Sequence, residues 1–300
     1  MIIIDYSQVA LSNIFMFQND LKKGAVRQED AVNIVRHAIL SGIKYYKKKY
    51  GREYGEMVIA CDGQNYWRRK LFPYYKASRS KQREKSDLDW KLIFDTISSI
   101  RDDLEAHFPY KVVSYDSAEA DDIIATLCKW TQTNGIVDYG IVEEQQKVLI
   151  ISADKDFKQL QIYKNVKQWS PMQKKFVTCD GPVQDFLTEH IVRGDSGDGI
   201  PNIFSPDAVF VTEGIKQQAV TSKKLANFIE NGRDACQTDE EKRNWDRNRD
   251  LIDFNFIPQD IQDAIVSIYE NKKPGGDKMA VMNYLIKHRC RMLLDELDEF

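Results

Sequence analysis

Three short apolar runs, each closely followed by acidic residues, are the most regular hydrophobic pattern in the chain. They are residues 2–4 before Asp5, Met57–Cys61 before Asp62, and Val148–Ile151 before Asp154 and Asp156. Each run is too short for a buried helix and is rich in β-branched or other apolar residues. This composition is typical of strands that are covered on both faces in a parallel sheet. The pattern therefore predicts an α/β fold.

The acids should meet at one edge of that sheet, because the carboxyl ends of parallel strands lie together and commonly carry the chemistry of such folds. A solvated turn explains a single acidic pair equally well. Two unit charges about 4 Å apart, however, repel by on the order of 4 kcal/mol at an effective dielectric near 20. A cluster drawn from three strands therefore indicates a site for a divalent metal ion.

Elsewhere, apolar residues recur every three or four positions, which is typical of helices that face a core. These helical segments are 26–50, 87–107, 117–130, 216–231, 240–251, 258–271 and 279–294. Further short strands are expected at 111–114, 165–169 and 175–178.

Composition narrows the class of protein. With 300 residues, 42% hydrophobic and 30% charged, the chain is expected to be soluble and globular. Its five cysteines stand singly without a CxxC, which favours reduced thiols in the cytoplasm, and its four histidines give no zinc spacing. No apolar run approaches the roughly 20 residues of a membrane span, and we expect no signal peptide and no membrane partner.

Residues 64–85, directly after the second acidic strand end, combine basic and aromatic side chains. The basic residues are Arg68, Arg69, Lys70, Lys76, Arg79, Lys81, Arg83 and Lys85, against the single acid Glu84. The aromatic residues are Tyr66, Trp67, Phe72, Tyr74 and Tyr75. Cations bind phosphates and aromatic faces stack on unpaired bases, so this stretch predicts nucleic-acid contact. A solvated insertion whose aromatic residues pack underneath is the alternative.

Two further segments carry acids. Residues 117–122 open a helix with Glu119, Asp121 and Asp122; the helix dipole accounts for one of these carboxylates and metal binding for the others. Residues 193–201 form a glycine-dense turn with Asp195 and Asp198, where the backbone can approach a phosphate or an ion closely. An ordinary loop between helices is the alternative for this turn.

Taken together, these segments resemble the structure-specific 5′-nuclease, or flap-endonuclease, superfamily over residues 2–201. WRRKLFPYYKASR is similar to a block in the 5′-nuclease domains of bacterial DNA polymerase I, with the signature at Arg68, Tyr75, Lys76 and Arg79. AEADD, SADKDF and GDSGDGIP match the other three family motifs in order. The helical remainder, with KQWSPM, is similar to the RNase H group of T-even bacteriophages, which belongs to this superfamily and is not similar to cellular RNase H.

The resemblance implies a mostly parallel central sheet flanked by helices, of the PIN/5′-nuclease type, with a basic arch at about 64–86. It also implies a helical C-terminal region with a helix–turn–helix-type motif that binds duplex DNA. We expect a catalytic domain at 1–180 and the helical region at 181–300, with the duplex-binding turn at 193–201.

The implied activity is that of a Mg²⁺-dependent 5′-to-3′ exonuclease and flap endonuclease. It would remove RNA primers and adjacent DNA from 5′ ends on duplexes during lagging-strand replication, by two-metal phosphodiester hydrolysis. Two Mg²⁺ ions are expected, with Mn²⁺ able to substitute. A K⁺ site is doubtful, because residues 202–206 replace the Gly-x-Gly segment of the family, and Gly199 replaces a common Asn. The expected setting is the cytoplasm, that of the host if a phage encodes the chain.

The family motifs assign site residues by position. The metal-binding set is Asp5, Asp62, Glu119, Asp121, Asp122, Asp154, Asp156, Asp195 and Asp198. The catalytic set is Lys76, Arg68, Asp62, Asp121, Asp154 and Asp156, with both cations at the scissile phosphate. The nucleic-acid-binding set is Arg68, Arg69, Tyr75, Lys76, Arg79, Lys81, Arg83, Gly194, Gly197 and Gly199.

Other functions remain open on the residues alone. A PIN-type ribonuclease shares the acidic sheet edge but lacks an arch, and a non-cleaving 5′-flap DNA-binding factor would be expected to lose acids. A phosphatase that uses Asp154 and Asp156 has no use for the basic stretch. We expect a monomer that binds DNA and RNA/DNA duplexes. Its acidic, apolar tail at 293–300 is either a frayed helix end or a docking segment for a sliding clamp or single-strand-binding protein.

Overall fold

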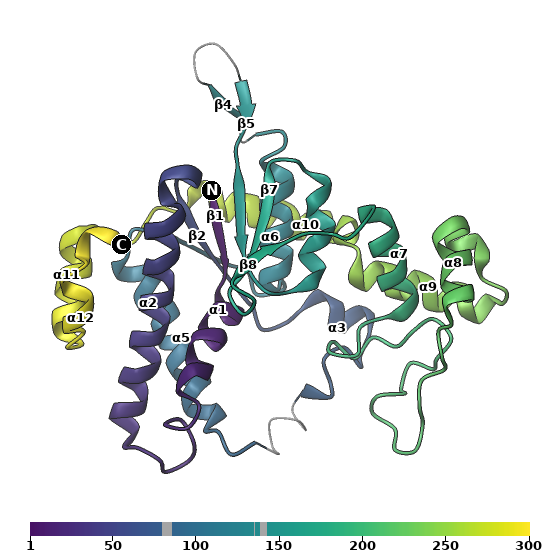
Figure 1. Cartoon of the computed structure of the whole chain (residues 1–300), viewed down its shortest axis with the longest axis horizontal. Helices are drawn as coiled ribbons and strands as arrows, with labels where there is room; N and C mark the ends of the chain where they lie inside the picture. The colour runs from purple at the N-terminus through teal and green to yellow at the C-terminus, as the bar shows by residue number, and fades with distance from the viewer. Residues whose placement is uncertain (80–85, 135, 139–142) are drawn as a thin grey trace.

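A six-stranded sheet crosses the middle of the protein (Figure 1). The computed structural model describes residues 1–79, 86–134, 136–138 and 143–300. The strands are β1 (Ile2–Asp5), β2 (Met57–Cys61), β3 (Lys111–Ser114), β6 (Val148–Ile151), β7 (Val166–Ser170) and β8 (Lys175–Val177). They lie in the order β3-β2-β1-β6-β7-β8, and every neighbouring pair is parallel except β7–β8. A hairpin of β4 (Ile136–Asp138) and β5 (Glu143–Gln145) stands apart from this sheet. The predicted α/β class with a mostly parallel sheet is confirmed.

The three predicted acidic strands form the centre of the sheet, and all their residues are buried. Side chains alternate between the faces because successive residues of a strand point to opposite sides. Ile2 and Ile4 enter one core, whereas Met1 and Ile3 enter the other. Continuous apolar runs are therefore the expected pattern, since both faces are covered.

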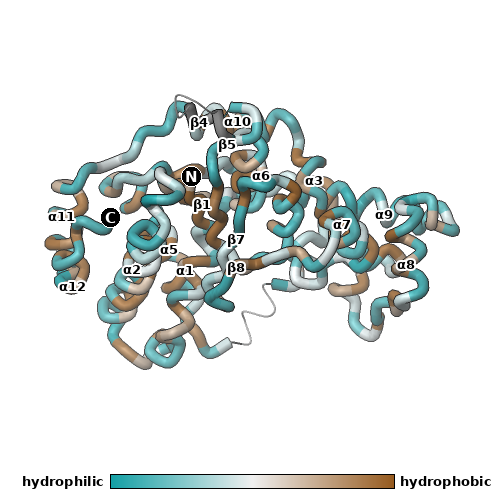
Figure 2. Tube along the Cα trace, turned by 45° about the horizontal axis from the view of Figure 1, so that its top comes forward, coloured by the Kyte–Doolittle hydropathy of each residue, from teal (hydrophilic) through white to brown (hydrophobic). Residues whose placement is uncertain are grey.

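Helices cover both faces (Figures 1 and 2). The core on one face is built with α1 (Tyr6–Ile14), α2 (Gln28–Tyr54), α5 (Trp90–His107), α11 (Lys278–Lys287) and α12 (Arg291–Leu294). The core on the other face is built with α6 (Ala120–Trp130), the 3-10 helix η2 (Lys155–Ile162) and α10 (Gln259–Asn271). Two helices from the end of the chain thus join these cores: α10 packs beside β3 and α6, and α11 packs against α5.

A third core joins α7 (Val183–Arg193), α8 (Ser222–Asn231) and α9 (Asp239–Ile252). Phe72 and Tyr75, which follow the short helix α3 (Trp67–Leu71), are buried in the same core. These two aromatic residues attach the start of the basic stretch to the C-terminal helices. The prediction that aromatic residues of 64–85 are free for bases is therefore wrong for these two, which pack underneath.

Two predicted helices differ most in extent from the observed ones. The segment expected at 279–294 is interrupted between α11 and α12, where Arg289 has a φ of +55°, a left-handed conformation that ends a helix of L-residues. The segment expected at 216–231 begins as a helix only at α8, which Thr221 caps by accepting from the N–H of Lys224. Among the described residues, no helix combines the length and apolar character needed to cross a membrane.

Candidate functional site

The strand-end acids meet at the carboxyl edge of the sheet, where β1 lies between β2 and β6. Asp5 ends β1 and is level with Ser152, whose Oγ donates a 2.8 Å hydrogen bond to Asp5 Oδ2. Asp62 follows β2, and its carboxylate accepts from Ser7 Oγ (2.7 Å) and from the Ala120 N–H (3.0 Å). Asp62 thereby links the sheet edge to the first turn of α6.

The acids in the first turn of α6 point in two directions. Asp122 is fully buried and accepts from the N–H of Glu119 (2.9 Å) and from Trp67 Nε1 (3.1 Å), while Arg68 lies 2.8 Å from its other oxygen. Asp121 instead neighbours the strand-end acids. Burial, followed by the nearby charges of Asp154 and Asp5, raises the pKa of Asp121 well above its usual range.

Glu119 is the centre of a buried network of charges. Its carboxylate pairs with Lys76 and with Arg68 (3.1 Å), and the Tyr75 hydroxyl donates to it at 2.8 Å. Burial alone would raise the pKa of Glu119, but Lys76 and Arg68 outweigh it and hold that pKa below the usual value. Burial would likewise lower the pKa of Lys76, yet Glu119 and Asp198 raise it. Lys76 is therefore a fixed cation at this edge.

The glycine turn packs directly against the base of the basic stretch. The Lys76 N–H donates to the Asp198 carbonyl (2.7 Å), and the Tyr75 hydroxyl lies 3.0 Å from Asp198 Oδ2. Arg79 pairs with the same carboxylate and donates to the Gly197 carbonyl (3.2 Å). Residues 72–79 and 193–201 thus form one structural unit.

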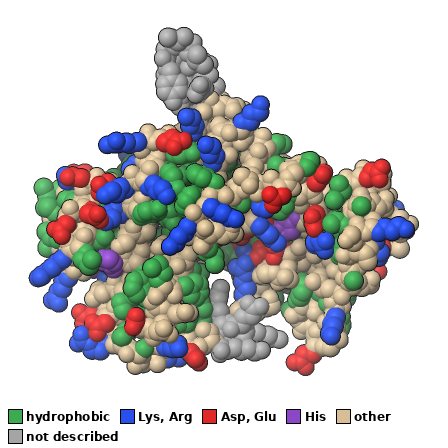
Figure 3. Space-filling view, in the orientation of Figure 1, with side chains coloured by type: hydrophobic (Ala, Val, Ile, Leu, Met, Phe, Trp, Pro, Cys, Tyr) green, Lys and Arg blue, Asp and Glu red, His purple; other side chains and the backbone are tan. Residues whose placement is uncertain are grey.

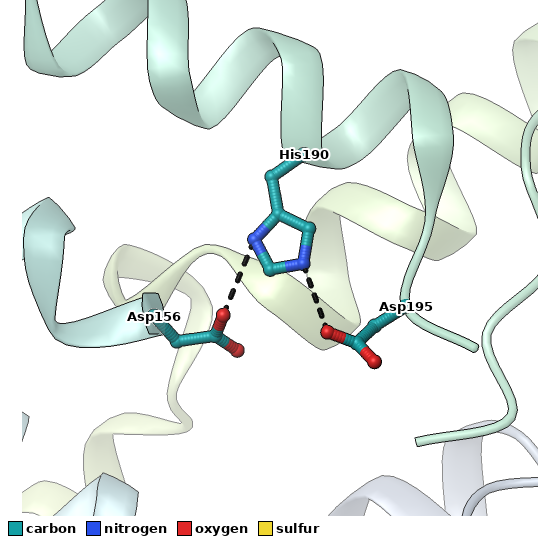
Figure 4. Close-up of side chains that lie close together, drawn as sticks. All are labelled: Asp156, His190 and Asp195. Atoms are coloured by element: carbon teal, nitrogen blue, oxygen red, sulfur yellow. Dashed lines mark hydrogen bonds and ion pairs between the residues drawn. The ribbon is translucent and has the colours of Figure 1, made fainter. Parts of the chain in front are cut away.

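A histidine lies between two acids beside this unit (Figure 4). Asp154 caps η2 by accepting from the Asp156 N–H (2.9 Å), which directs the Asp156 side chain toward His190 on α7. Nδ1 of His190 lies 3.3 Å from Asp156 Oδ1, and Nε2 lies 3.2 Å from Asp195 Oδ2. Lys155 Nζ is 2.8 Å from Asp195. The sequence reasoning missed His190; its place in the last turn of α7, before the glycine turn, is the signal that could have found it.

The electrostatics of the acids fit a divalent cation. Burial, and then the charge of Asp62, raises the pKa of Asp5 to about 7. Burial also raises the pKa of Asp156 to about 7; His190 acts to lower this pKa and the charge of Asp154 to raise it. Oδ1 of Asp156 and Nδ1 of His190 are buried and lack a hydrogen-bond partner among the described residues. Oxygen-rich, desolvated carboxylates that repel one another are suitable ligands for such an ion.

A hollow of about 370 Å³ lies next to these charges and is lined by basic and aromatic residues. Its lining includes Tyr66, Arg69, Tyr75, Lys76 and Arg79. Arg69 is exposed, with its guanidinium 4.8 Å from the centre of the Tyr66 ring. Figure 3 shows acidic side chains and a histidine gathered between the sheet and the α7–α9 region. Lys81 and Arg83 lie outside the described residues.

The three glycines of the predicted turn lie where neighbouring atoms leave little or no room for a side chain. Gly194 ends α7 with a φ of +66°, and a Cβ there would meet the carbonyl oxygens of Ile200 (2.4 Å) and Pro201 (2.5 Å). Gly199 has a φ of +74°, and a Cβ there would lie 2.9 Å from the Tyr74 carbonyl oxygen. A Cβ on Gly197 would lie 3.1 Å from Asp195 Oδ1.

Comparison with known proteins divides the chain between two family models. Residues 1–186 match the 5′-3′ exonuclease N-terminal resolvase-like domain, and residues 182–300 match the C-terminal domain of T4 RNase H. The chain is 34% identical to ribonuclease H of Enterobacteria phage T4, over 99% of this chain and 95% of that protein. It is 29% identical to the flap endonuclease Xni of Shewanella baltica, over 49% of this chain and 52% of Xni.

Solved structures show the same fold. The bacteriophage T5 D15 flap endonuclease, in a complex with DNA and metal ions, aligns with a TM-score of 0.61 and 18% identity, over 90% of this chain and 99% of that chain. The T5 5′-exonuclease with bound zinc aligns with a TM-score of 0.61 and 17% identity, over 90% of this chain and 98% of that chain.

Proposed function

Because this chain belongs to the 5′-3′ exonuclease family and carries the T4 RNase H type of C-terminal domain, we propose that it is a Mg²⁺-dependent 5′-to-3′ exonuclease and flap endonuclease. As a member of this family it is a nuclease, a phosphodiesterase. Its proposed substrates are 5′ ends and flaps on DNA and RNA/DNA duplexes, as in primer removal from lagging strands. The observation that carries the proposal is the convergence of acids from β1, β2, β6 and α6 beside buried Lys76.

The acids fall into two groups by their surroundings. Those at the sheet edge and glycine turn would hold two divalent ions: Asp5, Asp62, Asp121, Asp154, Asp156, Asp195 and Asp198. When bound, such ions supply positive charge for phosphoryl oxygens and lower the pKa of a bound water. Glu119 and Asp122 would instead hold Lys76 and Arg68 in place, since both carboxylates are engaged by these cations.

Lys76 and Arg68 take different parts in this proposal. Lys76 retains a side-chain exposure of 10% next to the hollow, so its ammonium can reach a phosphate and offset the charge that develops there. The Arg68 side chain is 4% exposed and donates to the Leu251 carbonyl (2.8 Å) besides pairing with Glu119 and Asp122. We therefore assign Arg68 a positioning role and not the phosphate contact expected from sequence.

The basic stretch and the glycine turn would bind different parts of the substrate. Arg69, Lys76 and Arg79 border the hollow where a 5′ single strand would enter, and the turn at 193–201 would grip duplex phosphates through its backbone. The division at 180/181 stays a prediction, because α10 and α11 join the two cores of the sheet domain while α7–α9 form their own core.

The acidic tail is docked on its own chain. Glu296 pairs with Lys44, Glu299 lies 3.0 Å from Lys48, and the Phe300 ring lies 5.5 Å from that of Phe108. These contacts support neither a frayed end nor a free docking segment, so the proposal includes no clamp or single-strand-binding protein at this tail.

Cleavage assays with 5′-labelled flap, nicked and single-stranded substrates, with Mg²⁺ and with chelator, test the proposal. Asp154→Asn should reduce cleavage at least about a thousandfold, because it removes one charge from the metal site. Asn can still accept from the Asp156 N–H, so the fold and DNA binding should survive. Asp180→Asn, at an exposed acid, is the matched control. Undiminished cutting by Asp154→Asn would exclude this role, and cleavage of plain single-stranded RNA without a junction would favour a PIN-type ribonuclease.

A further inference from the structure

The buried ring of His190 has no part in the proposed function, yet it lies between two acids of the metal-binding set (Figure 4). The side chain is 4% exposed. One ligand atom from each of Asp156, His190 and Asp195 lies within 4.8 Å of the others. The arrangement is therefore compact enough to surround a single ion.

The two ring nitrogens have different surroundings. Nε2 hydrogen-bonds to Asp195, whose other oxygen accepts from the N–H groups of Gly197 (2.8 Å) and Asp198 (3.2 Å). Lys155 also pairs with Asp195, so this carboxylate is held as an acceptor and Nε2 carries the proton. Nδ1 faces Asp156 Oδ1 at 3.3 Å, and among the described residues neither atom has a hydrogen-bond partner.

Two acceptors that face each other across 3.3 Å need a cation between them, either a proton or a metal ion. Two ligand atoms at right angles, each about 2.1 Å from the same ion, are about 3 Å apart, which is close to the observed separation. Histidines that bind metals usually donate the other ring N–H to a carboxylate, and this is the place of Asp195.

We propose that Nδ1 of His190 and Oδ1 of Asp156 bind one divalent ion together, while Asp195 orients the ring through Nε2. An imidazole ligand favours transition metals, whereas Mg²⁺ prefers oxygen ligands and water. This site therefore selects Mn²⁺ or Co²⁺ over Mg²⁺. The inference rests on the proposed function only in that both require a divalent ion at this edge.

Pulsed electron paramagnetic resonance of Mn²⁺ tests the proposal without an activity readout. The full chain is loaded with one equivalent of Mn²⁺ in an excess of Mg²⁺, which fills oxygen-only sites. Coordinated imidazole produces a ¹⁴N modulation, and the same protein grown with ¹⁵N-histidine should show the ¹⁵N frequencies instead. Absence of nitrogen coupling in this folded wild-type protein would overturn the proposal, leaving His190 as a hydrogen-bonded link between two carboxylates.

His190→Gln and its matched control His37→Gln give a second readout by calorimetry. Loss of the nitrogen ligand should weaken Mn²⁺ binding at least about tenfold, and Mg²⁺ binding by less than about threefold. His37→Gln should change neither. If His190→Gln weakened the binding of Mn²⁺ and of Mg²⁺ equally, His190 would not be a nitrogen ligand that selects Mn²⁺.

The two proposals fail in different ways. Flap cleavage with Mg²⁺ but no nitrogen coupling to Mn²⁺ would refute the histidine ligand and leave the nuclease standing. Nitrogen coupling without cleavage by any ion would support the ligand and refute the nuclease.

Discussion

Asp121 and Asp122 show how adjacent residues acquire different tasks. Successive positions of a helix point about 100° apart, so one carboxylate faces the strand-end acids while the other faces Trp67 and Arg68. Burial, which Arg68 opposes, raises the pKa of Asp122. Asp122 thus holds Arg68 and Trp67 in place, and Asp121 stays beside the strand-end acids, where we propose the metal site.

Lys76 allows a test at the scale of one residue. Lys76→Ala should lower the single-turnover cleavage rate by about a hundredfold or more, because it removes a cation from the developing phosphate charge. Flap affinity in Ca²⁺ should change far less. Lys76 has a φ of +57°, and Ala retains this left-handed conformation at a similar cost, so the backbone is not relieved as it would be by Gly. Lys287→Ala, at an exposed lysine of α11, is the control. A larger loss of affinity than of rate would make Lys76 a binding residue.

The raised pKa values of Asp5 and Asp156 predict the pH dependence of stability. Between the ordinary value of 3.8 and about 7, the folded protein keeps these protons while the unfolded chain has lost them. The free energy of unfolding of the metal-free protein should therefore fall as pH rises through this window and level off above about 7.

Mg²⁺ should restore the free energy of unfolding that the metal-free protein loses at pH 8. It should have little effect at pH 5, where protons occupy the carboxyls. Denaturant titrations at pH 5, 6, 7 and 8, with Mg²⁺ and with chelator, measure this. Asp5→Asn should flatten the slope because Asn does not titrate. Metal-free stability that rises across this window would contradict the assigned surroundings of both acids.

At the scale of elements, the glycine turn depends on how α7 ends. Gly194 and Gly232 both follow a helix with positive φ, +66° and +55°. At Gly232 a Cβ would meet nothing within 4 Å, whereas at Gly194 it would collide with the carbonyls of Ile200 and Pro201. The two positions therefore separate the cost of left-handed backbone from the cost of a clash.

Gly232→Ala should cost about 1 kcal/mol of stability, which is the backbone term alone. Gly194→Ala should cost more and should also weaken binding to duplex DNA, because 194–201 must shift and carry Asp195 and Asp198 with it. Thermal unfolding gives the stability of both variants, and duplex-binding titrations give their affinity for DNA. Equal effects of the two substitutions would show that the close approach at Gly194 is not needed.

For the whole molecule, the net charge of −3 conceals a separation of charge. The acids gather at the sheet edge, and the cations of the basic stretch border the hollow beside it. Substrate phosphates would therefore meet a local positive surface on a protein that is acidic overall, and neutralising them releases counterions.

Flap affinity in Ca²⁺ should consequently fall steeply with salt, with a slope of roughly −0.7 to −0.9 in log K against log salt for each phosphate neutralised. Arg69→Gln should make that slope shallower by about one such contact. Arg291→Gln, at an exposed arginine of α12, should leave it unchanged. An affinity that is flat in salt would contradict the arch assignment.

The sequence by itself determined the sheet and the acidic edge. Runs such as Val148–Ile151 suit only a strand covered on both faces, and parallel strands place Asp5, Asp62 and Asp154 at the same end. These are consequences of local composition and strand direction, so they can be read along the chain.

The tertiary structure alone decided the contacts between distant segments. It placed His190 between Asp156 and Asp195 and buried Phe72 and Tyr75 under the C-terminal helices. It also packed α10 beside β3 and α11 against α5. Packing between residues that are tens to hundreds of positions apart decides which helix covers which face of the sheet. No periodicity along the chain records that choice, and it is this packing that separated the acids at the sheet edge from those facing Arg68 and Lys76.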